Sequence, residues 1–231
     1  EFLWGLSDGI NDAGLSIALA YGGRQETGRG FGITTILRYV LETCETVPQA
    51  LRALQRVPSH MPYNVVVADA SGAAASVEIY AGGGAKVQPK LVATNHQTDG
   101  STPDRGAFTQ TFERSEHLNA VLSDGAAPST LVGRFKHAPL KQDRYAEGFG
   151  TLFTAEYEPK RRCMTLHWEG AAWAQSLDTF EEGTRNIQYG EAAVGWPHHA
   201  GGIDWVKIGM EYAAGRQPDW RSFVPDWGNV A

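Results

Sequence analysis

Apolar side chains recur along residues 33–44 at the spacing of one helix face. The apolar positions are Ile33, Ile36, Leu37, Val40, Leu41 and Cys44. Their i, i+3, i+4, i+7 repeat predicts a helix that is buried on one side. The sequence Thr-Val-Pro-Gln at 46–49 resembles a capping box with proline in the first turn, so we expect a second helix that ends before Pro58.

Strand-forming residues on both sides of turn residues predict three β-hairpins. In the first, turn residues at 8–14 separate an apolar run at 2–6 from a second run that ends at Tyr21. β-branched and apolar residues at 63–80 and 151–168 flank turn sequences in the same way. Each hairpin places two antiparallel strands side by side.

The remaining pattern predicts short strands at 85–88 and 91–95 and helices at 108–122 and 128–136. A chain of 231 residues with this mixture of elements commonly forms one domain.

The chain divides by composition near Gly170. We expect a core over 1–170, followed by an irregular extension of the same domain over 171–231. The last sixty residues hold five of the seven tryptophans, with many glycines and prolines and little periodicity. This tail would pack on the domain or on a partner subunit, which makes a homo-oligomer compatible with the sequence.

The charge balance argues against two classes of partner. A net charge of -6 and a pI near 5.6 provide no basic face for nucleic acid or for an anionic membrane. No apolar run approaches the ~18 residues of a membrane span, and the first residues lack the pattern of a secretory signal. Two cysteines fit a reducing compartment or a protein indifferent to oxidation, and we expect a cytoplasmic location.

Neither cysteine is a good candidate nucleophile. Cys44 lies on the apolar face of its helix, where a buried thiol is inert, and Cys163 begins a hairpin strand. The pair His198 and His199 lacks a third ligand at a metal-binding spacing, so we expect no metal and no organic cofactor.

Several motifs occur in an order that is informative. They are the hairpin sequence Gly-Ile-Asn-Asp-Ala-Gly-Leu at 9–15, the helix pair with Val-Leu-Glu-Thr-Cys at 40–44 and Val-Pro-Gln-Ala at 47–50, Asp-Ala-Ser-Gly at 69–72 with Val-Glu at 77–78, Ala-Thr-Asn-His at 93–96, and Thr-Leu-Phe-Thr-Ala at 151–155. In this series the chain resembles the choloylglycine hydrolase and acyl-coenzyme A:6-aminopenicillanic acid acyltransferase families, over about three quarters of its length. These are N-terminal-nucleophile (Ntn) hydrolases.

The resemblance implies a four-layer αββα Ntn sandwich and a nucleophilic N-terminal cysteine. The first residue here is Glu1, so the resemblance places the cysteine on a strand upstream of it and makes this chain N-terminally incomplete. A second departure from the family pattern is Gln97, because His-Phe usually follows the asparagine where this chain has His96-Gln97.

The resemblance also assigns roles to particular residues. Asn95 matches the asparagine whose amide stabilises the oxyanion, and Tyr21 matches a second donor to the same oxygen or to the substrate. Arg114, near a helix start, matches an arginine that orients the nucleophile region. On the residues alone, a strand-end asparagine, a core tyrosine and a solvated helix arginine are the ordinary interpretations.

Two further residues are expected to contact the substrate. His96 stands next to Asn95, and Arg24 lies in a glycine-rich loop after Tyr21, where it could meet a substrate carboxylate. Exposed loop arginines with no ligand are more common.

The sequence therefore predicts an acylase or amidase for linear non-peptide amides, or an acyltransferase, that works through a cysteine acyl-enzyme. The substrate would be a small acyl amide or acyl thioester. Sequence does not choose between hydrolase and acyltransferase, because both need the same acyl-enzyme. The alternative is a non-catalytic relative that binds an acylated ligand or a protein partner.

Overall fold

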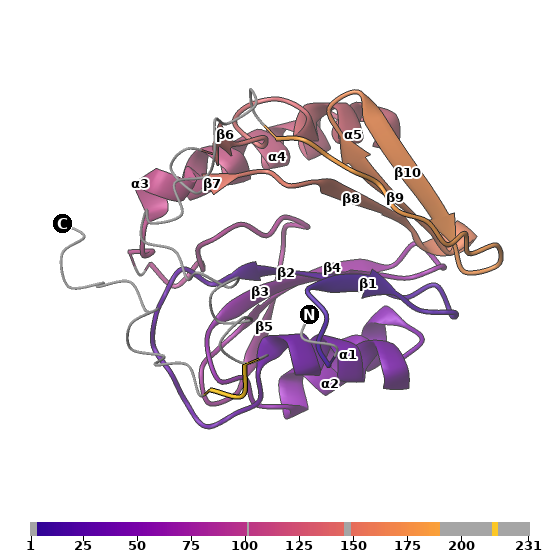
Figure 1. The fold of residues 1–231 in the computed structure, drawn as a ribbon. Helices are drawn as coiled ribbons and strands as arrows, with labels where there is room; N and C mark the ends of the chain where they lie inside the picture. Colours follow the sequence, from indigo (N-terminus) through magenta and orange to yellow (C-terminus); the bar gives the residue numbers. More distant parts are fainter. Residues whose placement is uncertain (1–3, 101, 146–148, 190–213, 217–231) are drawn as a thin grey trace. The chain divides into compact units, whose positions relative to one another are not determined.

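The protein has an α+β fold with antiparallel sheets (Figure 1). It divides into two compact units, Glu1–Ile187 and Gln188–Ala231, and the elements below belong to the first. The structure, a computed structural model, describes residues 4–100, 102–145, 149–189 and 214–216. The histidine pair at 198–199 lies outside the described residues.

Five strands form the larger sheet, in the order β1-β2-β3-β4-β5, and every neighbouring pair is antiparallel. The strands are β1 (Asp8–Ile10), β2 (Ser16–Tyr21), β3 (Tyr63–Ala68), β4 (Ala74–Ile79) and β5 (Ala85–Gln88). In the register of the sheet, Asn64 on β3 stands between Ala20 on β2 and Glu78 on β4. The pairings of β1 with β2 and of β3 with β4 confirm the predicted hairpins.

Two helices, α1 (Ile33–Thr43) and α2 (Val47–Arg56), cover one face of this sheet (Figure 1). Alternate strand residues such as Val65, Val67 and Val77 point into the core with the apolar faces of both helices. Cys44 is buried in the same core, as its place in the helix pattern predicted. The Gln49 side-chain oxygen accepts the Thr46 N–H at 3.2 Å, which confirms the expected cap at the start of α2.

The opposite face of the sheet is partly polar. It carries buried Asn64, Ser76 and Glu78, and all three hydrogen-bond to backbone groups between residues 92 and 98. The Ser76 hydroxyl, for example, donates to the carbonyl oxygen of Val92 at 3.2 Å. A loop that belongs to neither sheet is therefore anchored on this face.

A smaller sheet has the order β10-β9-β8. Its strands are β8 (Thr154–Glu158), β9 (Cys163–Trp168) and β10 (Ala171–Ser176), with the 3-10 turn η2 (Pro159–Arg161) between β8 and β9. The other elements are α3 (Gly106–Thr109), α4 (Thr111–Ser123), α5 (Pro128–Phe135) and the two-stranded pair β6 (Asp143–Arg144) and β7 (Phe149–Gly150).

The five-stranded and the three-stranded sheet contact each other where the turn after β1 meets the turn after β8. A Cβ atom on Gly14 would lie 2.4 Å from the carbonyl oxygen of Pro159, so only glycine allows this approach, at φ 79°. Tyr157 on β8 hydrogen-bonds Asp8 on β1, and burial together with the charge of that carboxylate raises the pKa of the phenol.

Several boundaries differ from those predicted. The first strand is Asp8–Ile10, inside the expected turn, and residues 91–95 form no strand. The helix predicted over 108–122 is broken at Gln110, which has a left-handed φ of 50° between α3 and α4. β10 lies in the tail that the sequence predicted to be irregular, and its unit extends past Gly170 to Ile187.

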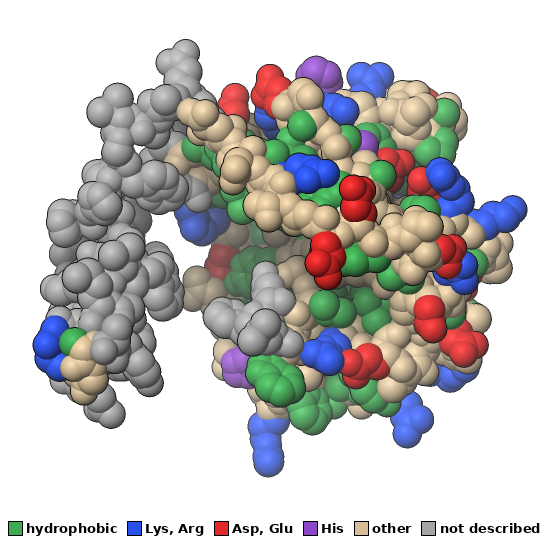
Figure 2. All heavy atoms as spheres, turned by 45° about the vertical axis from the view of Figure 1, so that its right-hand side comes forward, with side chains coloured by type: hydrophobic (Ala, Val, Ile, Leu, Met, Phe, Trp, Pro, Cys, Tyr) green, Lys and Arg blue, Asp and Glu red, His purple; other side chains and the backbone are tan. Residues whose placement is uncertain are grey.

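On the face drawn in Figure 2, acidic and basic side chains of the described residues are interspersed, with apolar side chains between them. Among the described residues, no helix is both long enough and apolar enough to cross a membrane.

Candidate functional site

Asn95 and Arg114, predicted from distant parts of the sequence, are in contact. The Arg114 Nη2 atom donates to Asn95 Oδ1 at 2.5 Å, and its Nε donates to the carbonyl oxygen of Thr109 at 2.9 Å. Arg114 lies in the first turns of α4, and the break at Gln110 leaves the Thr109 carbonyl in reach of its side chain. Burial lowers the pKa of Arg114, but a guanidinium in a protein stays charged.

This contact fixes the orientation of the Asn95 amide. An arginine only donates hydrogen bonds, so the atom facing Arg114 must be the amide oxygen. The Nδ2 group then points away from Arg114, and it has no hydrogen-bond partner among the residues that the structure describes. The site thus offers one N–H donor with a cation behind it, an arrangement that can stabilise developing negative charge on an oxygen.

His96 is held beside this pair in its neutral form. Its Nδ1 lies 2.9 Å from the Thr111 hydroxyl and 3.1 Å from the Thr94 hydroxyl, and its ring packs on Phe112 with centroids 4.4 Å apart. Burial, opposed by the charge of Glu78, lowers the pKa of His96. The imidazole is therefore uncharged at neutral pH.

A pocket of about 510 Å³ opens next to the His96 ring. It is lined by His96 and Phe112 together with Lys90, Ser115, Glu116, Asn119, Ala120 and Ser123. The lining combines two aromatic rings with one lysine and one glutamate. His96 thus lies at the edge of a hollow in the surface.

The end of β2 meets the same segment from the other side. A Cβ atom on Gly23, which has a φ of 83°, would lie 2.5 Å from the carbonyl oxygen of Asn95. The Gly23 carbonyl accepts the N–H of Asp104 at 2.6 Å, and Tyr21 donates its hydroxyl to Asp104 at 3.4 Å. Burial, together with the Asp104 charge, raises the pKa of Tyr21 to about 12. The phenol is thus protonated at neutral pH, with its hydrogen directed to Asp104.

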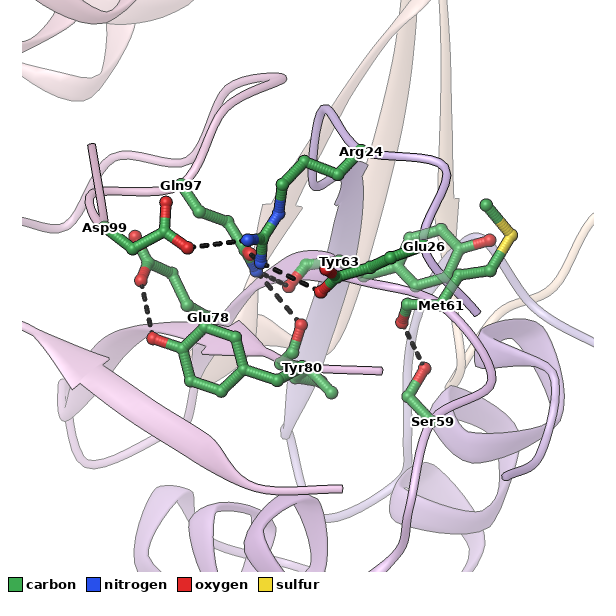
Figure 3. A network of polar contacts seen from close by, with 10 residues as sticks. Arg24, Glu26, Ser59, Met61, Tyr63, Glu78, Tyr80, Gln97 and Asp99 are labelled. Carbon is green, nitrogen blue, oxygen red and sulfur yellow. Dashed lines mark hydrogen bonds and ion pairs between the residues drawn. The ribbon is translucent and has the colours of Figure 1, made fainter. Parts of the chain in front are cut away.

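Arg24 is engaged by the protein itself (Figure 3). Its guanidinium lies 2.7 Å from Asp99 and 3.2 Å from Glu26, and it donates to the Gln97 side-chain oxygen at 2.6 Å. These ion pairs occupy both terminal nitrogens that a substrate carboxylate would use. Below Arg24, the Tyr80 hydroxyl donates to Glu78 at 3.0 Å (Figure 3).

The structure therefore brings Asn95, His96 and Arg114 into one cluster and connects Tyr21 and Arg24 to it through neighbours. Sequence reasoning missed the roles of Asn64 and Gln97, which are each 3% exposed. Asn64 donates to the Asn95 segment, and Gln97 donates from that segment to β4. The available signal was a lone asparagine, Asn64, in an otherwise apolar strand.

Neither cysteine contacts this cluster. Cys44 belongs to the core beneath the other face of the sheet, and the Cys163 thiol donates to the carbonyl oxygen of Arg161 at 3.1 Å. Within the described ranges, no three His, Cys, Asp or Glu side chains gather where they could hold a metal ion.

A model of the family described as Acyl-coenzyme A:6-aminopenicillanic acid acyl-transferase matches residues 1–173. The search of curated proteins finds no match. The matched span contains every site residue named above.

Proposed function

The chain belongs to the acyl-coenzyme A:6-aminopenicillanic acid acyl-transferase family, as its motifs predicted, and on this premise we propose that it transfers the acyl group of a linear non-peptide amide or a thioester to water or to an amine. Family membership implies an acyltransferase or hydrolase-type enzyme. Beyond family membership, we propose which type of bond is cleaved, by which mechanism, and which residues take part.

We assign the nucleophile to a cysteine upstream of Glu1, because Cys44 and Cys163 are both remote from Asn95. Its thiolate would attack the carbonyl carbon of the amide or thioester, and the carbonyl oxygen would become an oxyanion. Collapse breaks the bond to the leaving group, an amine that takes a proton or a thiolate, and leaves a thioester on the enzyme. Water or an acceptor amine then attacks the thioester and releases the cysteine.

In this scheme Asn95 donates to the oxyanion, and Arg114 fixes the amide and adds positive potential. Tyr21 would act as the second donor if it turns from Asp104. His96 would contact the substrate at the adjacent pocket, and Arg24 would contact it only if its ion pairs open. The α+β fold agrees with the Ntn sandwich that we propose as the architecture, with α1 and α2 as one outer layer.

One observation supports the proposal most directly. The Arg114 contact leaves the Asn95 N–H as a fixed donor without a partner among the described residues. A preorganised donor of this kind is worth about 10²–10³-fold in kcat when the oxyanion forms, and much less before it forms. No metal or organic cofactor is needed for the steps above.

The test is Asn95→Ala in the protein expressed from its complete coding sequence. Turnover is measured on a series of linear acyl p-nitroanilides of increasing chain length. We expect kcat to fall about 10²–10³-fold with little change in KM. Asn95→Asp should be at least as damaging, because a carboxylate would face the developing negative charge.

Asn186→Ala serves as the matched control, since Asn186 follows β10 and lies outside the lining of the pocket next to His96. Intact-mass analysis with a thiol-directed amide or lactone probe identifies the acylated cysteine. Labelling at Cys44 or Cys163, or a folded Asn95→Ala protein with near-normal kcat, would contradict the proposal.

A further inference from the structure

The segment that carries Asn95 is held by side chains instead of by a sheet. Residues 94–99 form no strand or helix, so no ladder of backbone hydrogen bonds fixes their path. Buried backbone groups still need partners, and here they find them on the polar face of the five-stranded sheet. The position of Asn95 therefore depends on which side chains supply those partners.

Asn64 holds the backbone on both sides of Asn95. Its Nδ2 donates to the carbonyl oxygens of Thr94 and His96, each at 2.7 Å. Both N–H groups of the amide are thus used, one for each neighbour of Asn95. Its own oxygen, Oδ1, is buried and has no hydrogen-bond partner among the described residues.

The unpaired Oδ1 atom raises the question of why residue 64 is an asparagine. A buried acceptor without a partner destabilises a fold, and an apolar side chain on β3 would avoid the penalty. Proteins leave buried polar groups unpaired mainly at functional sites, where the loss of stability is offset by a gain in function. In this protein, the two hydrogen bonds that Asn64 donates to the backbone offset the cost of its unpaired oxygen.

Gln97 fixes the segment two residues after Asn95. Its Nε2 donates to the carbonyl oxygens of Ile79 at 3.0 Å and Tyr63 at 3.3 Å, where β4 ends and β3 begins. Its Oε1 accepts from Arg24, which also pairs with Asp99 (Figure 3). A single side chain thus ties the segment to two strands and to the glycine-rich loop.

We propose that Asn64 and Gln97 are positioning residues for the oxyanion donor Asn95, and that they set its amide by holding the backbone on either side of it. The inference rests on the proposed function, because it assigns the two residues to that site. Neither residue touches the substrate in this scheme.

The test replaces each amide by an apolar side chain of similar size, Asn64→Leu and Gln97→Met, in the protein expressed from its complete coding sequence. Turnover on acyl p-nitroanilides should fall about 10–100-fold in kcat, since a donor displaced by about 1 Å loses most of its effect, while KM stays nearly unchanged. Amide hydrogen exchange should quicken in residues 94–99, including the Thr98 N–H that Glu78 accepts.

Ser16→Ala is the matched control. Ser16 is buried on β2, and its hydroxyl donates within the sheet, to the Ala68 carbonyl, instead of to the Asn95 segment. It should leave kcat and the exchange of residues 94–99 unchanged. If either apolar variant raises exchange across β2, β3 and β4 alike, and kcat per folded molecule is normal, the two amides are merely structural and the inference is wrong.

The outcomes separate the two proposals. Normal kcat in Asn64→Leu and Gln97→Met, beside a large fall in Asn95→Ala, overturns this inference alone. Normal kcat in Asn95→Ala, or a wild-type protein with no turnover and no acylated cysteine, overturns the proposed function together with the inference that depends on it.

Discussion

At the scale of single residues, the site depends on one amide group whose orientation is fixed by chemistry. Arg114 cannot accept a hydrogen bond, so Asn95 must turn its oxygen toward Arg114 and its N–H group away. His96 next to it is neutral, because burial disfavours the imidazolium. The only fixed cation in direct contact with Asn95, within the described residues, is therefore Arg114.

Arg114→Lys tests whether the shape of this cation matters as well as its charge. A lysine keeps the charge but cannot reach Thr109 and Asn95 with two separate N–H groups. We expect kcat to fall roughly tenfold and KM to change little, because the Asn95 amide loses its fixed orientation. Steady-state kinetics on the best acyl p-nitroanilide measures this. Arg134→Lys, at the end of α5, is the control, and equal kinetics for both variants would show that orientation by Arg114 is unimportant.

At the scale of elements, local patterns predicted the first two helices and the hairpin of β3 and β4. The apolar repeat gave α1, the Thr46 capping motif gave α2, and the turn at 69–72 gave the hairpin of β3 and β4. Each of these depends on residues close together in the sequence. The segment 91–95 was wrongly predicted as a strand, because its path is set by Asn64 and Ser76 from other strands.

The candidate site was predictable only in part, for the same reason. Asn95 and Arg114 could be named from family motifs, but their mutual contact spans 19 positions and depends on the break at Gln110. Arg24 was expected to meet a substrate carboxylate, whereas its partners Asp99 and Glu26 are in the chain. No local sequence pattern predicts such long-range contacts, and the amino-acid composition predicts them even less.

Asp69 connects two elements and should make their stability depend on pH. One carboxylate oxygen accepts the Val47 N–H at the start of α2 at 2.8 Å, and the other accepts from Ser71 in the turn after β3. Burial alone would raise the pKa of Asp69, but these hydrogen bonds lower it below its ordinary value. Because the folded-state pKa is the lower one, this stabilisation is complete above the unfolded-state pKa of about 3.9 and is lost as pH falls through the folded-state pKa.

Asp69→Asn should therefore lower the free energy of unfolding at pH 7 by about 1–3 kcal/mol, because a neutral amide replaces a charged acceptor. It should also remove part of the acid-induced loss of stability seen in the wild type below about pH 4. Urea unfolding across that pH range measures both effects. Asp124→Asn is the control, since Asp124 is exposed at the end of α4, and a matching pH profile in the two variants would rule out the role of Asp69.

At the scale of the larger unit, Glu1–Ile187, specific contacts join the five-stranded and the three-stranded sheet. The approach of Gly14 to Pro159 and the bond between Tyr157 and Asp8 both lie at the β1 side. The polar loop with Asn95 lies on the face of the larger sheet that α1 and α2 do not cover. The site thus depends on polar side chains that are buried on this face of the sheet.

Tyr157→Phe tests the contact between the sheets. The variant keeps the ring but removes the hydroxyl that bonds Asp8, so we expect a loss of about 1 kcal/mol in the free energy of unfolding. Thermal unfolding should show a lower Tm, with unchanged kcat per folded molecule. Tyr39→Phe is the comparison, because Tyr39 is exposed on α1. An equal Tm for the two variants would mean that the Tyr157 hydroxyl adds no stability.

The two faces of the larger sheet have a consequence for how faithfully the chain folds. Along β3 and β4, apolar residues that face the helices alternate with Asn64, Ser76 and Glu78. A slip of one strand past the other by a single residue would push a carboxylate or an amide into the apolar helix layer. Mispaired forms are therefore penalised during folding, and the strand register that survives is the one that sets Asn64 beneath Asn95.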